Sequence, residues 1–260
     1  MKQTGCAEIS IGSRTDVGRV RGNNEDACLV VPDIKLFVVS DGMGGQSGGE
    51  VASAMAVATI AQYCSAPPTG ISSYSHDRRL DLSEKTNCLI AAARLANRKI
   101  YQAGIEDPSL RGMGATVVAA WLEDLRLSLV HAGDSRAYLL RAGTLSQLTE
   151  DHTWVAEQIR AGLINSEEAQ LSKIQHFLVR ALGPHENVEL DATECILAND
   201  DIVLLCTDGL THMVSDQEIA RTLMECPDVQ TSADSLILMA NERGGQDNIT
   251  VVILRINPVV

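Results

Sequence analysis

An apolar run that ends on an aspartate and a cluster of glycines is the feature that most constrains this sequence. Residues 37–46 read Phe-Val-Val-Ser-Asp-Gly-Met-Gly-Gly-Gln, so an expected buried strand leads directly into Asp41 and a glycine-rich turn. The turn lacks the lysine that ends a phosphate-binding P-loop, and it lacks the third glycine of a dinucleotide-binding fingerprint. Because an acid at the start of the turn favours a cation, we expect Asp41 to bind metal.

The same pattern, an acid beside glycine or asparagine at the edge of an apolar segment, recurs along the chain. It is found at Asp134, Asp208 and Asp247, and the pair Glu25 and Asp26 precedes a further apolar run. A single Asp-Gly pair is most often a simple turn, but this repetition indicates that the acids converge on one site. Carboxylate and carbonyl oxygens suit hard cations such as Mg²⁺ and Mn²⁺. The six histidines show no zinc-binding spacing.

Composition excludes several classes of protein. The 260 residues carry a net charge of −13, which argues against nucleic-acid binding because no basic surface is available to release counterions. No run approaches the roughly 20 apolar residues of a membrane span, and the N-terminus lacks the apolar segment of a signal peptide. The seven cysteines form no Cys-x-x-Cys pair and are typical of reduced thiols. We expect a cytoplasmic protein that binds neither nucleic acid nor membrane.

The order of the expected elements favours one α+β domain over residues 1–260, with helices packed outside the sheets. Alternating and continuous apolar runs predict the strands, and apolar positions at helical spacing predict the helices. The expected strands are 7–13, 27–31, 36–40, 115–121, 125–132, 137–141, 144–148, 188–197, 201–207 and 249–256. The expected helices are 49–63, 83–102, 154–161, 166–170, 215–224 and 232–242, with an exposed loop over 64–81.

Six motifs follow one another along the chain. They are Arg21-x-x-x-Glu25-Asp26, Asp41-Gly42-Met43-Gly44-Gly45, Gly112-Met113-Gly114-Ala115-Thr116, Gly133-Asp134-Ser135-Arg136, Asp208-Gly209-Leu210 and Gly245-x-Asp247-Asn248. In this order they resemble the metal-dependent type-2C protein serine/threonine phosphatases (the PPM family), above all its bacterial branch. The resemblance covers about residues 8–256. It implies a four-layer αββα fold, a central sandwich of two antiparallel β-sheets flanked by helices on both outer faces, with a mobile flap near residues 162–183.

The resemblance also implies a set of cation ligands. Asp41 would bridge two Mn²⁺ or Mg²⁺ ions, and the carbonyl of Gly42 would bind the second. Asp208 and Asp247 would complete the first site. Asp134, together with Asp208, would support a weaker third ion.

Three further residues would act around these ions. Glu25 and Asp26 would lie near the second ion and bind it through waters. Arg21 would hold the substrate phosphate, for which the planar guanidinium is suited because it donates two hydrogen bonds at once. A hydroxide shared by the two ions would then attack phosphorus in line.

The implied activity is hydrolysis of phosphoserine and phosphothreonine in cytoplasmic proteins, in opposition to protein kinases. The implied partners are phosphorylated proteins, together with a serine/threonine kinase and its targets, and the family default is a monomer. Two alternatives stay open. One is a catalytically weak relative that binds phosphoproteins, and the other is a small-molecule phosphomonoesterase that uses the same site.

The chain departs from the family pattern at the proton donor. Relatives carry histidine where Gln46 or Met43 stands here, so the general acid for the leaving group is not identified. His152 is a weak candidate, and we expect His131 and His212 to serve packing or surface roles. Cys206 is interpreted as strand core because no anion-binding loop follows it. The stretch 171–174 of the flap also departs from the usual pattern, so substrate preference does not transfer.

Overall fold

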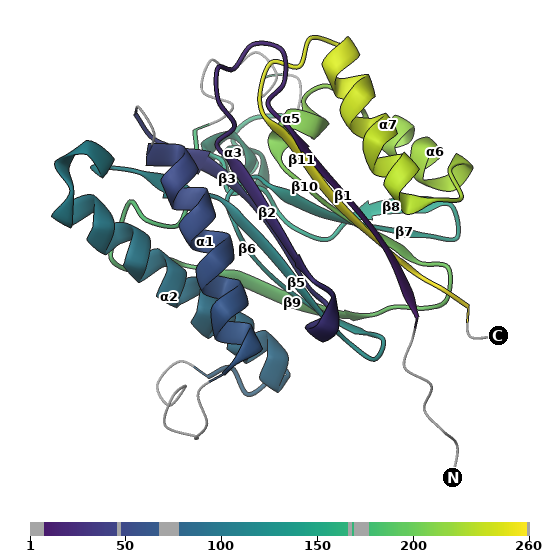
Figure 1. The fold of residues 1–260 in the computed structure, drawn as a ribbon, viewed down its shortest axis with the longest axis horizontal. Helices are drawn as coiled ribbons and strands as arrows, with labels where there is room; N and C mark the ends of the chain where they lie inside the picture. The colour runs from purple at the N-terminus through teal and green to yellow at the C-terminus, as the bar shows by residue number, and fades with distance from the viewer. Residues whose placement is uncertain (1–7, 46–47, 68–77, 166–167, 169–176, 259–260) are drawn as a thin grey trace.

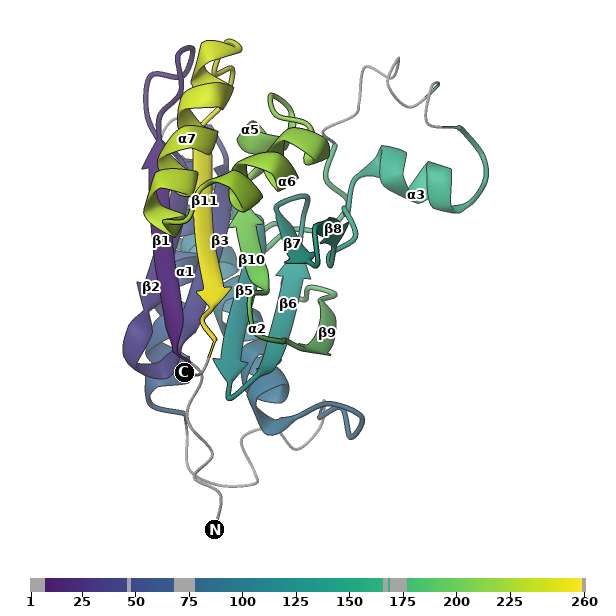
Figure 2. The same cartoon turned by 90° about the vertical axis from the view of Figure 1, so that its right-hand side faces the viewer.

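Two antiparallel sheets lie face to face, and helices cover the outer face of each (Figures 1 and 2). The computed structural model describes residues 8–45, 48–67, 78–165, 168 and 177–258. The strands are β1 (Ile9–Asp16), β2 (Asp26–Val31), β3 (Leu36–Met43), β4 (Gly114–Ala115), β5 (Val117–Glu123), β6 (Arg126–Ala132), β7 (Arg136–Arg141), β8 (Thr144–Gln147), β9 (Asp191–Ile196), β10 (Ile202–Cys206) and β11 (Ile249–Ile256). The helices are α1 (Gly48–Ser65), α2 (Glu84–Glu106), α3 (Trp154–Arg160), α5 (Asp208–Thr211), α6 (Asp216–Glu225) and α7 (Val229–Glu242), with short 3-10 turns at Pro32–Ile34 and Pro108–Leu110.

The strand order confirms the four-layer fold expected from the sequence. One sheet has the order β1-β11-β10-β7-β8, and the other has the order β2-β3-β5-β6-β9 with β4 paired to β3. Helices α1 and α2 pack on the second sheet, whereas α6 and α7 cover the first (Figure 1). None of the helices in the described ranges is long and apolar enough to cross a membrane.

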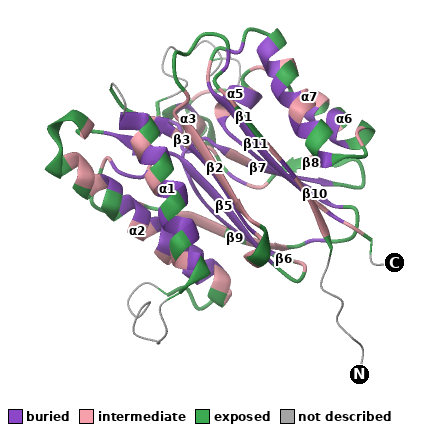
Figure 3. Ribbon diagram, in the orientation of Figure 1, coloured by how far each residue is buried: buried purple, intermediate pink, exposed green. Residues whose placement is uncertain are grey.

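Three apolar layers fill the gaps between these four layers of secondary structure (Figure 3). Strand β3 shows how the sequence builds them, because successive side chains of a strand point to opposite faces. Leu36 and Val38 belong to the layer under α1 and α2. Phe37 and Val39 belong to the layer between the two sheets. A continuous apolar run is therefore required here, since both faces of β3 are buried.

Most element boundaries agree with the sequence to within two residues, but α2 ends four residues later than expected, at Glu106, and α7 begins three residues earlier. We expected this helix to start at Ser232, but it begins at Val229 because the Asp228 side chain accepts a hydrogen bond from the N–H of Thr231. An aspartate at the N-cap satisfies a backbone donor that the helix itself cannot. The helix expected over residues 166–170 lies outside the described residues except for Glu168.

The pairing of β2 with β3 sets up one end of the sandwich. Its register places Asp26 directly opposite Asp41, so two acids meet where β2 begins and β3 ends. The N–H of Gly42 donates to the carbonyl of Glu25 at 3.1 Å. A Cβ atom on Gly42 would lie 2.0 Å from the carbonyl oxygen of Gly49 in α1, so only glycine allows α1 to approach this closely.

We expect the apolar layer between the two sheets to contribute strongly to the free energy of unfolding. Phe37 is fully buried between the sheets, so Phe37→Ala should lower the free energy of unfolding by roughly 3–5 kcal/mol, as measured by urea denaturation. The matched control is Leu80→Ala at a side chain that is 91% exposed, which should stay within about 0.5 kcal/mol of the parent. Equal effects of the two substitutions would contradict the assignment of the core.

Candidate metal centre

A cavity of about 440 Å³ opens at the end of the sandwich where β2 begins and β3 ends. The turn after β6, the segment after β10 and the segment before β11 bring further acids to the same place. Asp26 does not line the cavity and is buried beside it. The other sequence-predicted residues all line it: Arg21, Glu25, Asp41, Gly42, Asp134, Asp208 and Asp247.

Asp41 is held in place by Thr116, a residue of the third motif to which the sequence analysis assigned no role. The N–H of Asp41 donates to Thr116 Oγ1 at 2.9 Å, and the N–H of Thr116 donates to the carbonyl of Asp41 at 2.8 Å. The hydroxyl of Thr116 also lies 2.6 Å from that of Ser135, in the turn that carries Asp134. One buried threonine therefore fixes the spacing between two acids.

Asp26 joins the two sheets. Its Oδ2 accepts hydrogen bonds from the hydroxyls of Thr207, at 2.9 Å, and Thr250, at 2.7 Å. Thr207 follows β10 and Thr250 lies in β11, both in the sheet opposite β2. The other oxygen, Oδ1, is buried with no hydrogen-bond partner among the described residues, and Oδ1 of Asp208 is in the same state.

Burial and repulsion between carboxylates raise the pKa values of Asp26, Asp41 and Asp134. The pKa of Asp41 lies well above its usual range, mainly because of burial and then because of the charges of Asp26 and Asp208. Burial raises the pKa of Asp26 to about 7 and that of Asp134 to about 8, with Asp208 adding to both. Oxygen atoms without partners in an acidic, buried setting need either protons or a cation. The donor set, all oxygen, fits a hard divalent cation.

Asn248 organises the loops around Glu25. Its side chain accepts from the N–H of Glu25 at 2.8 Å and donates to the carbonyls of Val17 and Asn23, each at 2.9 Å. The sequence placed Asn248 in a motif without giving it this role. The carboxylate of Glu25 lies close to α1, since a Cβ atom on Gly49 would lie 2.6 Å from its Oε2.

Arg21 does not stand free at the mouth of the cavity. Its guanidinium donates to Oδ2 of Asp247 at 2.7 Å, and about half of the Arg21 side chain is exposed. The pairing raises the pKa of Arg21 further above its usual value, chiefly through this hydrogen bond. The residue expected to hold phosphate and a residue expected to hold a cation are therefore bound to each other in the structure.

The histidines lie around the cavity but do not line it in the described part of the chain. His212 approaches Asp208 from outside, with Nδ1 3.5 Å from Oδ2. His131 and His152 are buried and stacked, with ring centroids 4.7 Å apart. Met43 lines the cavity, whereas Gln46 lies outside the described residues. Cys206 is fully buried in β10, as its interpretation as strand core required.

One group of three side chains in the described ranges places a metal-binding atom of each within 4.8 Å, and it consists of His131, His152 and Asp191. The two rings are almost parallel, at 11°. A cation lies in the ring plane of an imidazole that binds it, and one ion cannot lie in two stacked planes. Arg180 also donates to Asp191 at 3.1 Å and would repel a cation. We therefore do not assign metal to this group.

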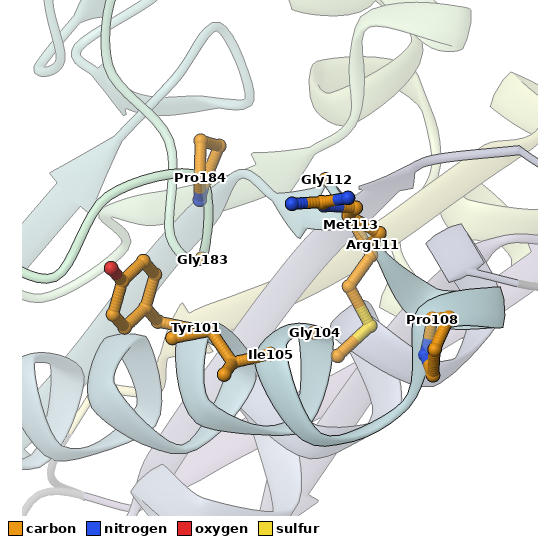
Figure 4. A pocket seen from close by; sticks show the side chains of 9 residues that line it. All are labelled: Tyr101, Gly104, Ile105, Pro108, Arg111, Gly112, Met113, Gly183 and Pro184. Atoms are coloured by element: carbon orange, nitrogen blue, oxygen red, sulfur yellow. The ribbon is translucent and has the colours of Figure 1, made fainter.

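Two further cavities extend from the acidic one. A cavity of about 410 Å³ shares Met43 and Leu178 with it. A third, of about 490 Å³, shares Pro184 with the second. Figure 4 shows this third cavity, with Tyr101 and Ile105 of α2 on one side and Arg111 and Pro184 on the other. The shared residues show that the three cavities are neighbours in a row.

Sequence comparison identifies relatives along nearly the whole chain. A family model described as Protein phosphatase 2C matches residues 19–248. The serine/threonine protein phosphatase PstP of Mycobacterium tuberculosis is 42% identical over 245 residues, which cover 94% of this chain and 44% of PstP. The serine/threonine phosphatase stp of Listeria welshimeri is 36% identical over 257 residues, with 94% of each protein covered. The chain thus spans less than half of PstP and nearly all of stp.

Solved structures agree with the sequence comparison. The crystal structure of the Mycobacterium tuberculosis serine/threonine phosphatase PstP/Ppp has a TM-score of 0.83 at 38% identity, covering 96% of this chain and 99% of that one. The catalytic domain of PstP in complex with two manganese ions gives a TM-score of 0.81 at 38% identity, with 96% of this chain and 99% of that chain covered.

The raised pKa values predict how stability depends on pH without divalent cations. The folded state holds protons on Asp26 and Asp134 more tightly than the unfolded chain, whose carboxyl pKa is about 4. The free energy of unfolding therefore decreases as the pH rises from about 4 through the folded-state pKa values of about 7 for Asp26 and about 8 for Asp134. In EDTA, the melting temperature should fall between pH 5.5 and pH 8.5.

Added Mn²⁺ should remove most of this fall, because the cation replaces the protons. Asp26→Asn should reduce the slope in EDTA, since it removes one of the titrating acids. A melting temperature in EDTA that is flat or rises over this range would contradict the electrostatic account of the site.

Proposed function

The chain belongs to the protein phosphatase 2C family, and from that premise we propose that it hydrolyses phosphoserine and phosphothreonine in proteins with the help of divalent cations. The observation that carries the proposal is the meeting of Arg21 with acids from five separate segments in one cavity. A scaffold that only binds phosphoproteins would have no need for buried acids whose mutual repulsion opposes folding. The set of acids therefore favours the enzyme over the catalytically weak relative.

In this proposal the acids hold two Mn²⁺ or Mg²⁺ ions and a weaker third. Asp41 would bind both ions, and the carbonyl of Gly42 would bind the second; Asp208 and Asp247 would complete the first site. Glu25 and Asp26 would act near the second ion through waters, and Asp134 with Asp208 would support the third. The unpartnered Oδ1 atoms of Asp26 and Asp208 support this assignment. So does the relative PstP, whose catalytic domain is described in complex with two manganese ions.

Divalent cations bound there supply a water of lowered pKa as the nucleophile and neutralise charge on the phosphoryl group. The chain itself must then orient the phosphate and keep the acids ionised. Arg21 would hold two phosphate oxygens with its planar fork. In the structure the guanidinium of Arg21 is hydrogen-bonded to the carboxylate of Asp247. A cation on Asp247 would therefore free the guanidinium for substrate, so that cation and phosphate binding support each other.

The leaving group also needs a proton. In the described part of the chain no histidine lines the cavity, and Met43 cannot donate one. We infer that the leaving alkoxide takes its proton from water held in the cavity. This differs from relatives that carry histidine at the position of Met43 or Gln46.

A protein substrate suits the shape of the site better than a small ester. The row of three cavities gives room for residues that flank the phosphorylated side chain. We propose that the substrates are products of a serine/threonine kinase in the cytoplasm, and that residues 1–260 act as one monomeric phosphatase domain. The described cysteines form no disulfide with one another, as expected in a reducing compartment. The negative net charge argues against nucleic acid as a partner.

Hydrolysis of a phosphothreonine peptide and of p-nitrophenyl phosphate, each with Mn²⁺ and then with EDTA, tests the activity. We expect Mn²⁺-dependent turnover of both. Turnover of the small ester alone would favour the phosphomonoesterase, and no turnover of either would reject the enzyme.

Replacement of Asp41 should separate activity from folding. Asp41→Asn should lower kcat on the order of 10³-fold, because the acid between the ions is lost. The same change should raise the melting temperature in EDTA, because it relieves repulsion from Asp26 and Asp208. Activity that survives Asp41→Asn would show that the cation assignment is wrong.

Replacement of Arg21 tests phosphate binding. Arg21→Ala should raise KM for the phosphopeptide by about 10- to 100-fold, the loss expected for charged hydrogen bonds. Arg14→Ala is the matched control, since Arg14 forms an exposed ion pair with Asp234 away from the cavity. Unchanged kcat and KM in Arg21→Ala would refute its phosphate role.

A further inference from the structure

His152 lies between two parts of the active site without touching the cavity. Its side chain is fully buried, and its ring stacks on that of His131 in β6. Burial lowers the pKa of His152, so the ring is neutral and carries one proton. The two ring nitrogens then have different roles, one as acceptor and one as donor.

The Nδ1 atom faces the turn that carries Asp134. The N–H of Gly133 donates to His152 Nδ1 at 3.2 Å, and the N–H of His152 donates to the carbonyl of Gly133 at 3.0 Å. Gly133 has φ +104°, and a Cβ atom there would lie 2.6 Å from Thr116. The turn is thus pressed against Thr116 on one side and bonded twice to His152 on the other.

The Nε2 atom faces the chain that returns from the flap. Because Nδ1 accepts, Nε2 carries the proton and donates to Asp191 Oδ2 at 3.2 Å. The other oxygen of Asp191 accepts from Arg180 at 3.1 Å. The backbone of His152 contributes as well, since its carbonyl accepts from the N–H of Val179 at 2.9 Å. Phe177 and Leu178, in the same returning segment, line the acidic cavity.

We propose that His152 is a positioning residue that fixes the Asp134 turn through Nδ1 and, through the bond of Nε2 to Asp191 and of Asp191 to Arg180, the returning segment 177–180. One ring thereby sets the distance between the site of the weakest cation and the wall of the cavity that meets the substrate. This inference rests on the proposed function, because it gives Asp134 a cation to hold. The positioning of the Asp134 turn is assigned to Nδ1 and that of segment 177–180 to Nε2, so substitutions that replace one nitrogen at a time can separate the two effects.

Asparagine and glutamine separate the two nitrogens. An asparagine amide reaches close to the position of Nδ1, and a glutamine amide reaches close to that of Nε2. His152→Asn therefore keeps the bond to Gly133 and loses the bond to Asp191. His152→Gln does the reverse.

The readouts are calorimetric titration with Mn²⁺ and KM for a phosphothreonine peptide. In His152→Gln, the weakest class of Mn²⁺ sites should lose affinity roughly fivefold, the effect of one buried hydrogen bond. Asp134→Asn identifies that class, because it should abolish it. In His152→Asn, Mn²⁺ affinity should stay at the parent value, whereas KM should rise roughly fivefold.

Asp191→Ala is the matched control for the hydrogen bond that His152 Nε2 donates, because it removes the acceptor. It should raise KM as His152→Asn does and leave Mn²⁺ affinity unchanged, and the double variant should show no further rise. Equal losses of Mn²⁺ affinity in His152→Asn and His152→Gln, or an unchanged KM in Asp191→Ala, would overturn the proposal. If the parent protein proves inactive on phosphopeptides, the proposed function fails. The Mn²⁺ affinities of His152→Gln and His152→Asn would still show whether Nδ1 positions the Asp134 turn.

Discussion

Repulsion among buried carboxylates is the interaction on which this structure depends. Asp26, Asp41, Asp134 and Asp208 meet at one end of the sandwich, where burial raises the pKa values of the first three. Such a group is stable only if the chain supplies donors and leaves room for a positive partner. The hydroxyls of Thr207 and Thr250 supply two of these donors. The oxygens of Asp26 and Asp208 without a hydrogen-bond partner among the described residues mark where a positive partner is needed. The two sheets thus provide a rigid frame for charges that would otherwise separate.

Rigidity in this frame comes from hydrogen bonds between residues far apart in the sequence. Thr116 joins β3 to the Asp134 turn, Asn248 joins the last strand to the loop before β2, and His152 joins the same turn to the returning segment. Each of these side chains is buried and each bonds to the backbone. The acids are therefore positioned by a polar framework that is separate from the apolar layers.

The strands, the helices and the recurring acids were readable from local patterns, and the four-layer arrangement followed from the resemblance to a known family. The continuous apolar run before Asp41 predicts a strand buried on both faces, and β3 is such a strand. The helix start at Val229 was missed because Asp228 was not recognised as a cap. The pair Arg21–Asp247 joins residues 226 positions apart, and no local pattern encodes it. The same holds for the bonds of His152 to Gly133 and Asp191, which depend on how β6, β8 and β9 meet.

The double acceptor role of Asp26 has a consequence for how this protein can diverge. One carboxylate oxygen of Asp26 binds the hydroxyls of Thr207, just after β10, and Thr250 in β11, while Asp26 itself belongs to the other sheet. The distance between the sheets at this end therefore depends on the length of one side chain. Substitutions in the central apolar layer that widen or narrow the sandwich would move Asp26 relative to Asp208. A substitution that changes the volume of the central layer would therefore also change the cation site. It would have to be accompanied by a substitution at Thr207 or Thr250 that restores the position of Asp26.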